Sequence, residues 1–122
     1  MHERRYTRDH IWVCLAGELA TVGITDHAQS ELGAVTYVTV KKKGSAVAQG
    51  GTLGVIESVK TASELVAPIA GRILRINPLV VKTPARINSD PLGEGWICEL
   101  EPDDPAQVDA LLDEAAYRLL VG

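Results

Sequence analysis

A lysine inside a short segment of small and polar residues is the side chain of this protein best placed for chemistry. Residues 57–63 read Glu-Ser-Val-Lys-Thr-Ala-Ser, so no large neighbour shields the amine of Lys60. A compact amine on a flexible four-carbon stem is well suited to covalent modification. On spacing alone, a lysine in a turn is more often a solubilising surface charge, and a modification site is the sharper alternative.

The residues on both sides of Lys60 predict the element that presents it. Residues 52–56 are rich in β-branched and apolar side chains, and the same character resumes at residues 65–69. Two such runs around a short polar segment predict a β-hairpin with the lysine near its tip. Glu57 and Glu64 flank the lysine, where they either hold its charge or form part of the surface that a modifying enzyme recognises.

A competing hypothesis is a small enzyme in which Ser58 acts as nucleophile and Lys60 as base. Residues two apart in a strand face the same side. However, no oxyanion motif and no third, orienting group accompanies them. Asp26 and His27 are equally unsupported as an acid–base pair. We therefore expect a protein that is not an enzyme.

Three ordered motifs give the chain a family resemblance. Residues 57–63 resemble the lipoylation motif of the glycine cleavage system H protein, in which the lysine carries lipoate. Residues 21–29, Thr-Val-Gly-Ile-Thr-Asp-His-Ala-Gln, and residues 88–96, Asn-Ser-Asp-Pro-Leu-Gly-Glu-Gly-Trp, resemble two further stretches of that family. Biotin-carrying relatives place methionine on both sides of their lysine, whereas Val59 and Thr61 occupy those positions here. The resemblance therefore favours lipoate.

The resemblance implies a carrier whose lipoate, joined to Lys60 by an amide, serves as a swinging arm between enzymes. It implies attachment by a lipoate ligase or lipoyltransferase, followed by exchange with glycine decarboxylase, aminomethyltransferase and dihydrolipoyl dehydrogenase. The aminomethyl-loaded arm of the family folds into a cleft on the carrier's own surface. Recognition by the ligase and the partners is expected to involve the residues around the lysine, namely Glu57, Ser58, Val59, Ala62 and Glu64.

Departures from the family pattern leave a second pathway open. The family's first motif is His-Glu-Trp, with its Glu in the cleft, whereas residues 10–12 here read His-Ile-Trp. Ile11 offers no acceptor to a cationic amine, although Asp9 or Glu64 could partly substitute. Positions that are often acidic in the family are basic here: Lys41, Lys42, Lys43, Arg72, Arg75 and Lys82. The alternative is an H-like lipoate-binding protein that serves a heterodisulfide-reductase-like complex in bacterial sulfur oxidation.

Composition sets the outer limits. The chain has 122 residues, of which 46% are apolar and none is Phe, which predicts one domain over residues 1–122 with an aliphatic core. The net charge of −4 argues against nucleic acid as the main partner. The chain has no segment typical of a membrane span or a signal peptide, so we expect a cytoplasmic protein that does not contact membranes.

The cysteines and histidines suggest no further chemistry. Cys14 and Cys98 stand in separate strand-like segments and are expected to be reduced, buried thiols. His2, His10 and His27 show no metal-ligand spacing with cysteines or carboxylates, which predicts that there is no metal site.

The pattern of elements predicts a mainly β fold. Strands are expected at residues 11–15, 18–24, 35–40, 72–77 and 96–101, with irregular chain at 78–95 and one helical turn near Leu79. A short helix at residues 28–32 is expected to be capped by Thr25 or Asp26 and closed by Gly33. A C-terminal helix is expected at about 105–120, with Asp104 and Gln107 in a capping box. The resemblance implies the barrel-sandwich hybrid of lipoyl and biotinyl carriers, with the two strands around Lys60 in different sheets.

Overall fold

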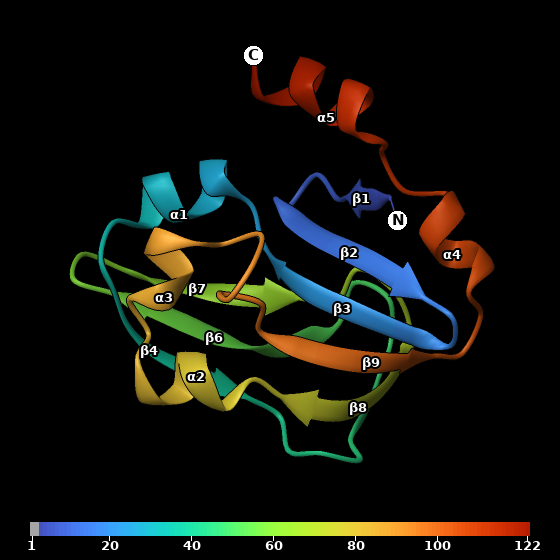
Figure 1. The fold of residues 1–122 in the computed structure, drawn as a ribbon, viewed down its shortest axis with the longest axis horizontal. Helices are drawn as coiled ribbons and strands as arrows, with labels where there is room; N and C mark the ends of the chain where they lie inside the picture. The colour runs from blue at the N-terminus through green and yellow to red at the C-terminus, as the bar shows by residue number, and fades with distance from the viewer. Residues whose placement is uncertain (1–2) are drawn as a thin grey trace.

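The computed structural model describes residues 3–122, which form two antiparallel sheets with helices at one end and along one side (Figure 1). The strands are β1 (Arg4–Tyr6), β2 (Ile11–Ala16), β3 (Leu19–Ile24), β4 (Val35–Val40), β5 (Ala46–Val47), β6 (Thr52–Ser58), β7 (Ala62–Val66), β8 (Gly71–Ile76) and β9 (Cys98–Pro102). The helices are α1 (Asp26–Leu32), α2 (Pro78–Lys82), α3 (Arg86–Ser89), α4 (Ala106–Asp109) and α5 (Glu114–Val121). The larger sheet has the order β1-β2-β3-β9-β8-β5, and the smaller sheet has the order β4-β6-β7.

The two sheets bury their inner faces against each other. Val22 on β3 and Leu100 on β9 have no exposed surface, and neither does Leu53 on β6. Alternation along the strands directs these aliphatic side chains inward and polar ones outward. The mainly β, barrel-sandwich fold expected from the sequence is confirmed, and its core is aliphatic as the composition predicts.

The hairpin around Lys60 is confirmed, but its predicted division between two sheets is wrong. β6 and β7 pair directly within the smaller sheet, with Ile56 opposite Ser63 and Glu57 opposite Ala62. The connection between the strands comprises residues 59–61 alone. So short a turn returns the chain antiparallel to itself, and crossing to another sheet needs a longer connection.

Helices α1, α2 and α3 gather at the end of the molecule where the β6–β7 hairpin turns (Figure 1). The Thr25 hydroxyl caps α1 by accepting the Ala28 N–H at 3.2 Å, as predicted. Gly33 follows α1 with φ +77°, a conformation that glycine adopts without a steric penalty. Asn88 of α3 holds the junction together, because it donates to the Gly33 carbonyl at 2.8 Å and accepts the Val35 N–H at 2.8 Å.

The continuous C-terminal helix predicted at about 105–120 is wrong. The chain forms α4 and α5 with an extended break between them, where the Tyr6 N–H donates to the Leu112 carbonyl at 2.8 Å and the Leu112 N–H donates back at 3.0 Å. Asp113 caps α5 by accepting the Ala116 N–H at 2.9 Å. Gln107 forms no capping box; its side chain accepts the Ala70 N–H at 2.8 Å. Pairing with a distant strand thus overrides a helical pattern that is continuous in the sequence.

β1 was not predicted, because Arg-Arg-Tyr carries no strand pattern by itself. It forms because Tyr6 pairs with Trp12 on β2, and because Arg4 lies over the Trp12 ring at 5.2 Å and donates to the Leu92 carbonyl at 2.7 Å. Tyr6 and Trp12 form a second, aromatic cluster with Tyr117 of α5. Tyr6 and Tyr117 stack with their ring centroids 4.6 Å apart. Tertiary contacts of this kind leave little trace in a local sequence window.

Candidate functional site

Lys60 lies exposed in the turn of the β6–β7 hairpin, as the sequence predicts. The Ser58 N–H closes the turn by donating to the Thr61 carbonyl at 2.7 Å. The Ser58 hydroxyl oxygen lies 3.2 Å from the Thr61 N–H and 3.4 Å from the Lys60 N–H, and it is 3.2 Å from the Thr61 carbonyl oxygen. Because this hydroxyl bonds to the turn itself, its geometry explains how the lysine is held and does not support a nucleophile.

The lysine turn docks on the end of α1. The Val59 N–H donates to the Ala34 carbonyl at 3.1 Å. The lysine stem crosses Gly33 so closely that a β-carbon at that position would lie 3.1 Å from Lys60 Cε. A side chain there would meet both the stem and a strained backbone. The absence of a side chain at Gly33 therefore leaves room for the stem of Lys60.

The two glutamates that flank the lysine have different surroundings. Within residues 3–122, neither Glu57 nor Glu64 forms an ion pair with Lys60. Glu57 is exposed at the end of β6. The Glu64 carboxylate accepts a hydrogen bond from the Thr52 hydroxyl and lines a cleft beside the hairpin. Of their two predicted roles, charge pairing with the unmodified lysine is wrong, and recognition remains a prediction.

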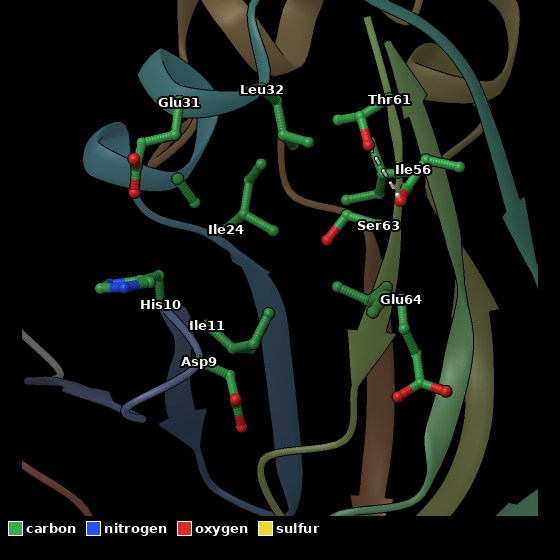
Figure 2. A pocket seen from close by; sticks show the side chains of 13 residues that line it. Asp9, His10, Ile11, Ile24, Glu31, Leu32, Ile56, Thr61, Ser63 and Glu64 are labelled. Atoms are coloured by element: carbon green, nitrogen blue, oxygen red, sulfur yellow. Dashed lines mark hydrogen bonds between the residues drawn. The ribbon is translucent and has the colours of Figure 1, made fainter.

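The cleft lies between the β6–β7 hairpin on one side and β2, β3 and α1 on the other (Figure 2). Its volume of about 340 Å³ falls in the range of small-molecule sites. Buried aliphatic side chains form its floor: Ile11, Ile24, Leu32, Ile56 and Leu65. Exposed carboxylates stand along its rim: Asp9, Glu31 and Glu64.

The carboxylates of the rim lie near position 11, where the family's first motif has a glutamate and this chain has Ile11. Ile11 is 3% exposed and belongs to the floor of the cleft. Asp9 and Glu64, the two acidic residues expected to compensate for it, both line the cleft from opposite sides (Figure 2). Glu31 of α1 is a third carboxylate that the sequence did not single out. The loss of one glutamate thus leaves a cleft that still presents anionic groups to a cation.

Two histidines and Glu31 meet at the edge of this cleft, contrary to the expectation that the histidines lie in no metal-ligand arrangement. His27 and Glu31 face the same side of α1, with His27 Nε2 2.9 Å from a Glu31 oxygen. The His10 ring lies 4.5 Å from the His27 ring between centroids. Burial, followed by the neighbouring His27, lowers the pKa of His10 below its ordinary value. His2, the third histidine, lies outside the described residues.

His10 is also the one non-glycine residue among residues 3–122 with a positive φ, at +65°. Its N–H donates to the Thr7 carbonyl at 3.1 Å, and its own carbonyl accepts the Thr25 N–H at 3.0 Å. A residue other than glycine keeps such a backbone conformation only where its surroundings hold it there. The loop before β2 therefore holds the His10 backbone in one conformation, and spacing in the sequence carries no sign of it.

The two thiols are only partly as predicted. Cys98 on β9 is fully buried, and burial raises its pKa to about 12. Cys14 on β2 is only half-buried. Within residues 3–122 no disulfide joins them. Among the helices of the same residues, none is long and apolar enough to cross a membrane.

The two-sheet β fold with a lysine at a hairpin tip is the architecture of lipoyl and biotinyl carrier domains. The family model described as glycine cleavage H-protein matches residues 4–121. The chain is 48% identical over 117 residues to the glycine cleavage system H protein of Myxococcus xanthus, a match that covers 96% of this chain and 91% of the relative. It is 47% identical over 116 residues to the glycine cleavage system H protein of Thermus thermophilus, covering 95% of this chain and 91% of that relative.

A solved structure agrees with these sequence matches. The crystal structure of a glycine cleavage system H protein from Mycobacterium marinum superimposes with a TM-score of 0.90 at 36% identity, covering 98% of this chain and 97% of that one. The chain belongs to the glycine cleavage H-protein family.

Family membership favours glycine cleavage over the sulfur-oxidation alternative, which rested on local substitutions. One of these has a structural explanation: Arg75 pairs with Glu99 at 3.1 Å and lies over the Trp96 ring at 5.0 Å. Ile11 lies in the floor of a cleft whose rim carries the carboxylates of Asp9, Glu31 and Glu64. Nothing in the structure explains the lysine run at residues 41–43.

Proposed function

We propose that the chain, acting as one carrier domain over residues 1–122, carries lipoate in amide linkage on Lys60 for the glycine cleavage system. The observation that carries this proposal is the position of an exposed, turn-held lysine next to a cleft with an apolar floor and an acidic rim. Bound lipoate would supply a dithiol that accepts a cargo and is reoxidised afterwards. The lysine Nζ would supply only the attachment point, losing its charge to the amide.

The cleft is suited to a loaded arm of mixed polarity. The aliphatic floor, which includes Ile24 and Ile56, would exclude water from the hydrocarbon part of the arm. A cationic amine at its end loses hydration on entry and needs charged or hydrogen-bonded partners. Asp9, Glu31 and Glu64 would provide them. In this chain, the three carboxylates of the rim would take the role that a glutamate at position 11 has in the family motif.

The residues near the lysine divide into two groups. Ser58 shapes the turn, so its contribution to recognition would be the geometry of the backbone. Glu57, Val59 and Ala62 are exposed and make up the surface that a ligase meets. Val59 has 71% of its surface exposed, so its side chain is accessible to a partner.

The family implies partners within the glycine cleavage system. We propose that these are a lipoate ligase or lipoyltransferase, glycine decarboxylase, aminomethyltransferase and dihydrolipoyl dehydrogenase, all met in the cytoplasm. We also propose a carrier without catalytic activity. The bonding of the Ser58 hydroxyl within its own turn supports this over the enzyme alternative, which hydrolysis of model esters would detect.

Intact-mass analysis after co-expression with a lipoate ligase tests the attachment site. We expect one lipoyl group on the parent chain and on Lys82→Arg, and none on Lys60→Arg. Peptide mapping should place the group on residues 58–63. A lipoyl group on any of the lysines at 41–43, or retained in Lys60→Arg, would refute the assignment.

A further inference from the structure

The imidazoles of His10 and His27 and the carboxylate of Glu31 converge at the edge of the cleft. One ligand atom from each residue lies within 4.8 Å of the others. In a tetrahedral zinc site, bonds of about 2.0–2.1 Å place the ligand atoms about 3.3 Å apart. The three groups thus need only small side-chain rotations to close around one ion. All three are half-buried or exposed, so these rotations do not disturb the core.

Contacts behind His10 prepare it as a ligand. His10 Nδ1 lies 2.8 Å from the Tyr117 hydroxyl, which lies 2.7 Å from the Thr25 hydroxyl. When Nδ1 carries the proton and donates to Tyr117, and Tyr117 donates to Thr25, His10 Nε2 is left with a free lone pair. Hydrogen bonds of this kind orient metal-ligating imidazoles and fix their tautomer. The His10 backbone beside this ring is itself held by hydrogen bonds to Thr7 and Thr25.

The electrostatic surroundings favour a cation. The charged groups that act on His10 are the carboxylates of Glu31 and Asp9, together with the His27 ring. Among residues 3–122, no lysine or arginine lines the adjoining cleft. Arg118 lines the pocket on the other side of His27, where it pairs with Glu114 at 2.9 Å. Two imidazoles 4.5 Å apart repel each other if both are protonated, whereas a bound metal uses both in their neutral form.

We propose that His10, His27 and Glu31 form a binding site for a divalent transition-metal cation, with Zn²⁺ as the best match to two imidazoles and one carboxylate. Three protein ligands leave a coordination position open toward solvent and the cleft, as in exchangeable zinc sites. The metal would take the place of the proton between His27 and Glu31. The site does not depend on the modification of Lys60.

Zinc titration by calorimetry of the unlipoylated full-length chain, with the cobalt absorption spectrum as a second readout, tests this site. We expect one zinc ion per chain. His27→Ala and Glu31→Gln should each weaken binding by at least about tenfold, a loss already seen for outer ligand-orienting groups in metal sites. His10→Asn should do the same, and asparagine tolerates the positive φ of that position. Circular dichroism would confirm that each variant remains folded.

Matched variants separate this site from zinc binding elsewhere on the chain. Tyr117→Phe, which removes the hydroxyl behind His10, should weaken zinc by about tenfold. His2→Ala, Glu18→Gln and Lys82→Arg should bind as the parent does. The proposal would be overturned if the parent and control chains showed no saturable 1:1 binding of zinc. It would also be overturned if His27→Ala and Glu31→Gln bound zinc with unchanged affinity. Loss of binding in His2→Ala alone would assign the zinc to the N-terminus and overturn it equally.

Discussion

The acidic rim of the cleft predicts how long the carrier holds a cationic cargo. Asp9 and Glu64 stand on opposite sides of the cleft and are both exposed, so each contributes as a surface charge. Exposed ion pairs stabilise by about 0.2–1 kcal/mol each, which gives about 0.4–2 kcal/mol for the two. Neutralising both in Asp9→Asn/Glu64→Gln should therefore shorten the lifetime of the amine-loaded state by about 2- to 30-fold.

The assay loads the lipoylated, reduced chain with the amine cargo and follows its first-order release. Glu18→Gln/Asp109→Asn is a matched control, because it removes the same charge outside the cleft. The lifetime of the parent should fall toward that of the cleft variant at 1 M salt, where the Debye length is about 3 Å. If the cleft variant and the control released cargo at the same rate, Asp9 and Glu64 would not hold the amine and this prediction would be refuted. Glu31 would then be the remaining carboxylate to test.

Two further predictions follow from buried groups. Ile24→Asp should lower the free energy of unfolding by more than about 3 kcal/mol, because it replaces a side chain that is 3% exposed by a carboxylate in an apolar floor. Ile24→Asn should lose less, and equal denaturation midpoints for parent and Ile24→Asp would contradict the packing. Cys98 should resist iodoacetamide in the native state at pH 8.5 and react after unfolding, as peptide mass spectrometry would show. Because burial raises its pKa from 9.0 to about 12, the unfolded chain releases this proton first, so stability should fall as pH rises between those values and Cys98→Ala should reduce the slope.

The sequence was sufficient for the features whose signals are local. The hairpin around Lys60 follows from two β-rich runs and a polar turn, and α1 follows from Thr25 at its start and Gly33 at its end. The family follows from three ordered motifs, and the similarity to known H proteins confirms it. Each of these is encoded within about ten neighbouring residues, where spacing, capping and turn chemistry act directly.

The tertiary structure decided what depends on residues far apart in the chain. β1 exists because Tyr6 meets Trp12 and Leu112, and the same pairing with Leu112 divides the expected C-terminal helix into α4 and α5. The cleft assembles Asp9, Glu31 and Glu64 from three separate segments.

The histidine cluster has the same origin. His10 comes from the loop before β2 and His27 from α1, and Tyr117 reaches His10 from α5 across 107 positions of sequence. A side chain's partners are set by which surfaces the two sheets bury against each other. Spacing along the chain therefore reveals the attachment lysine, whereas only the packed fold reveals the groups that surround its cleft.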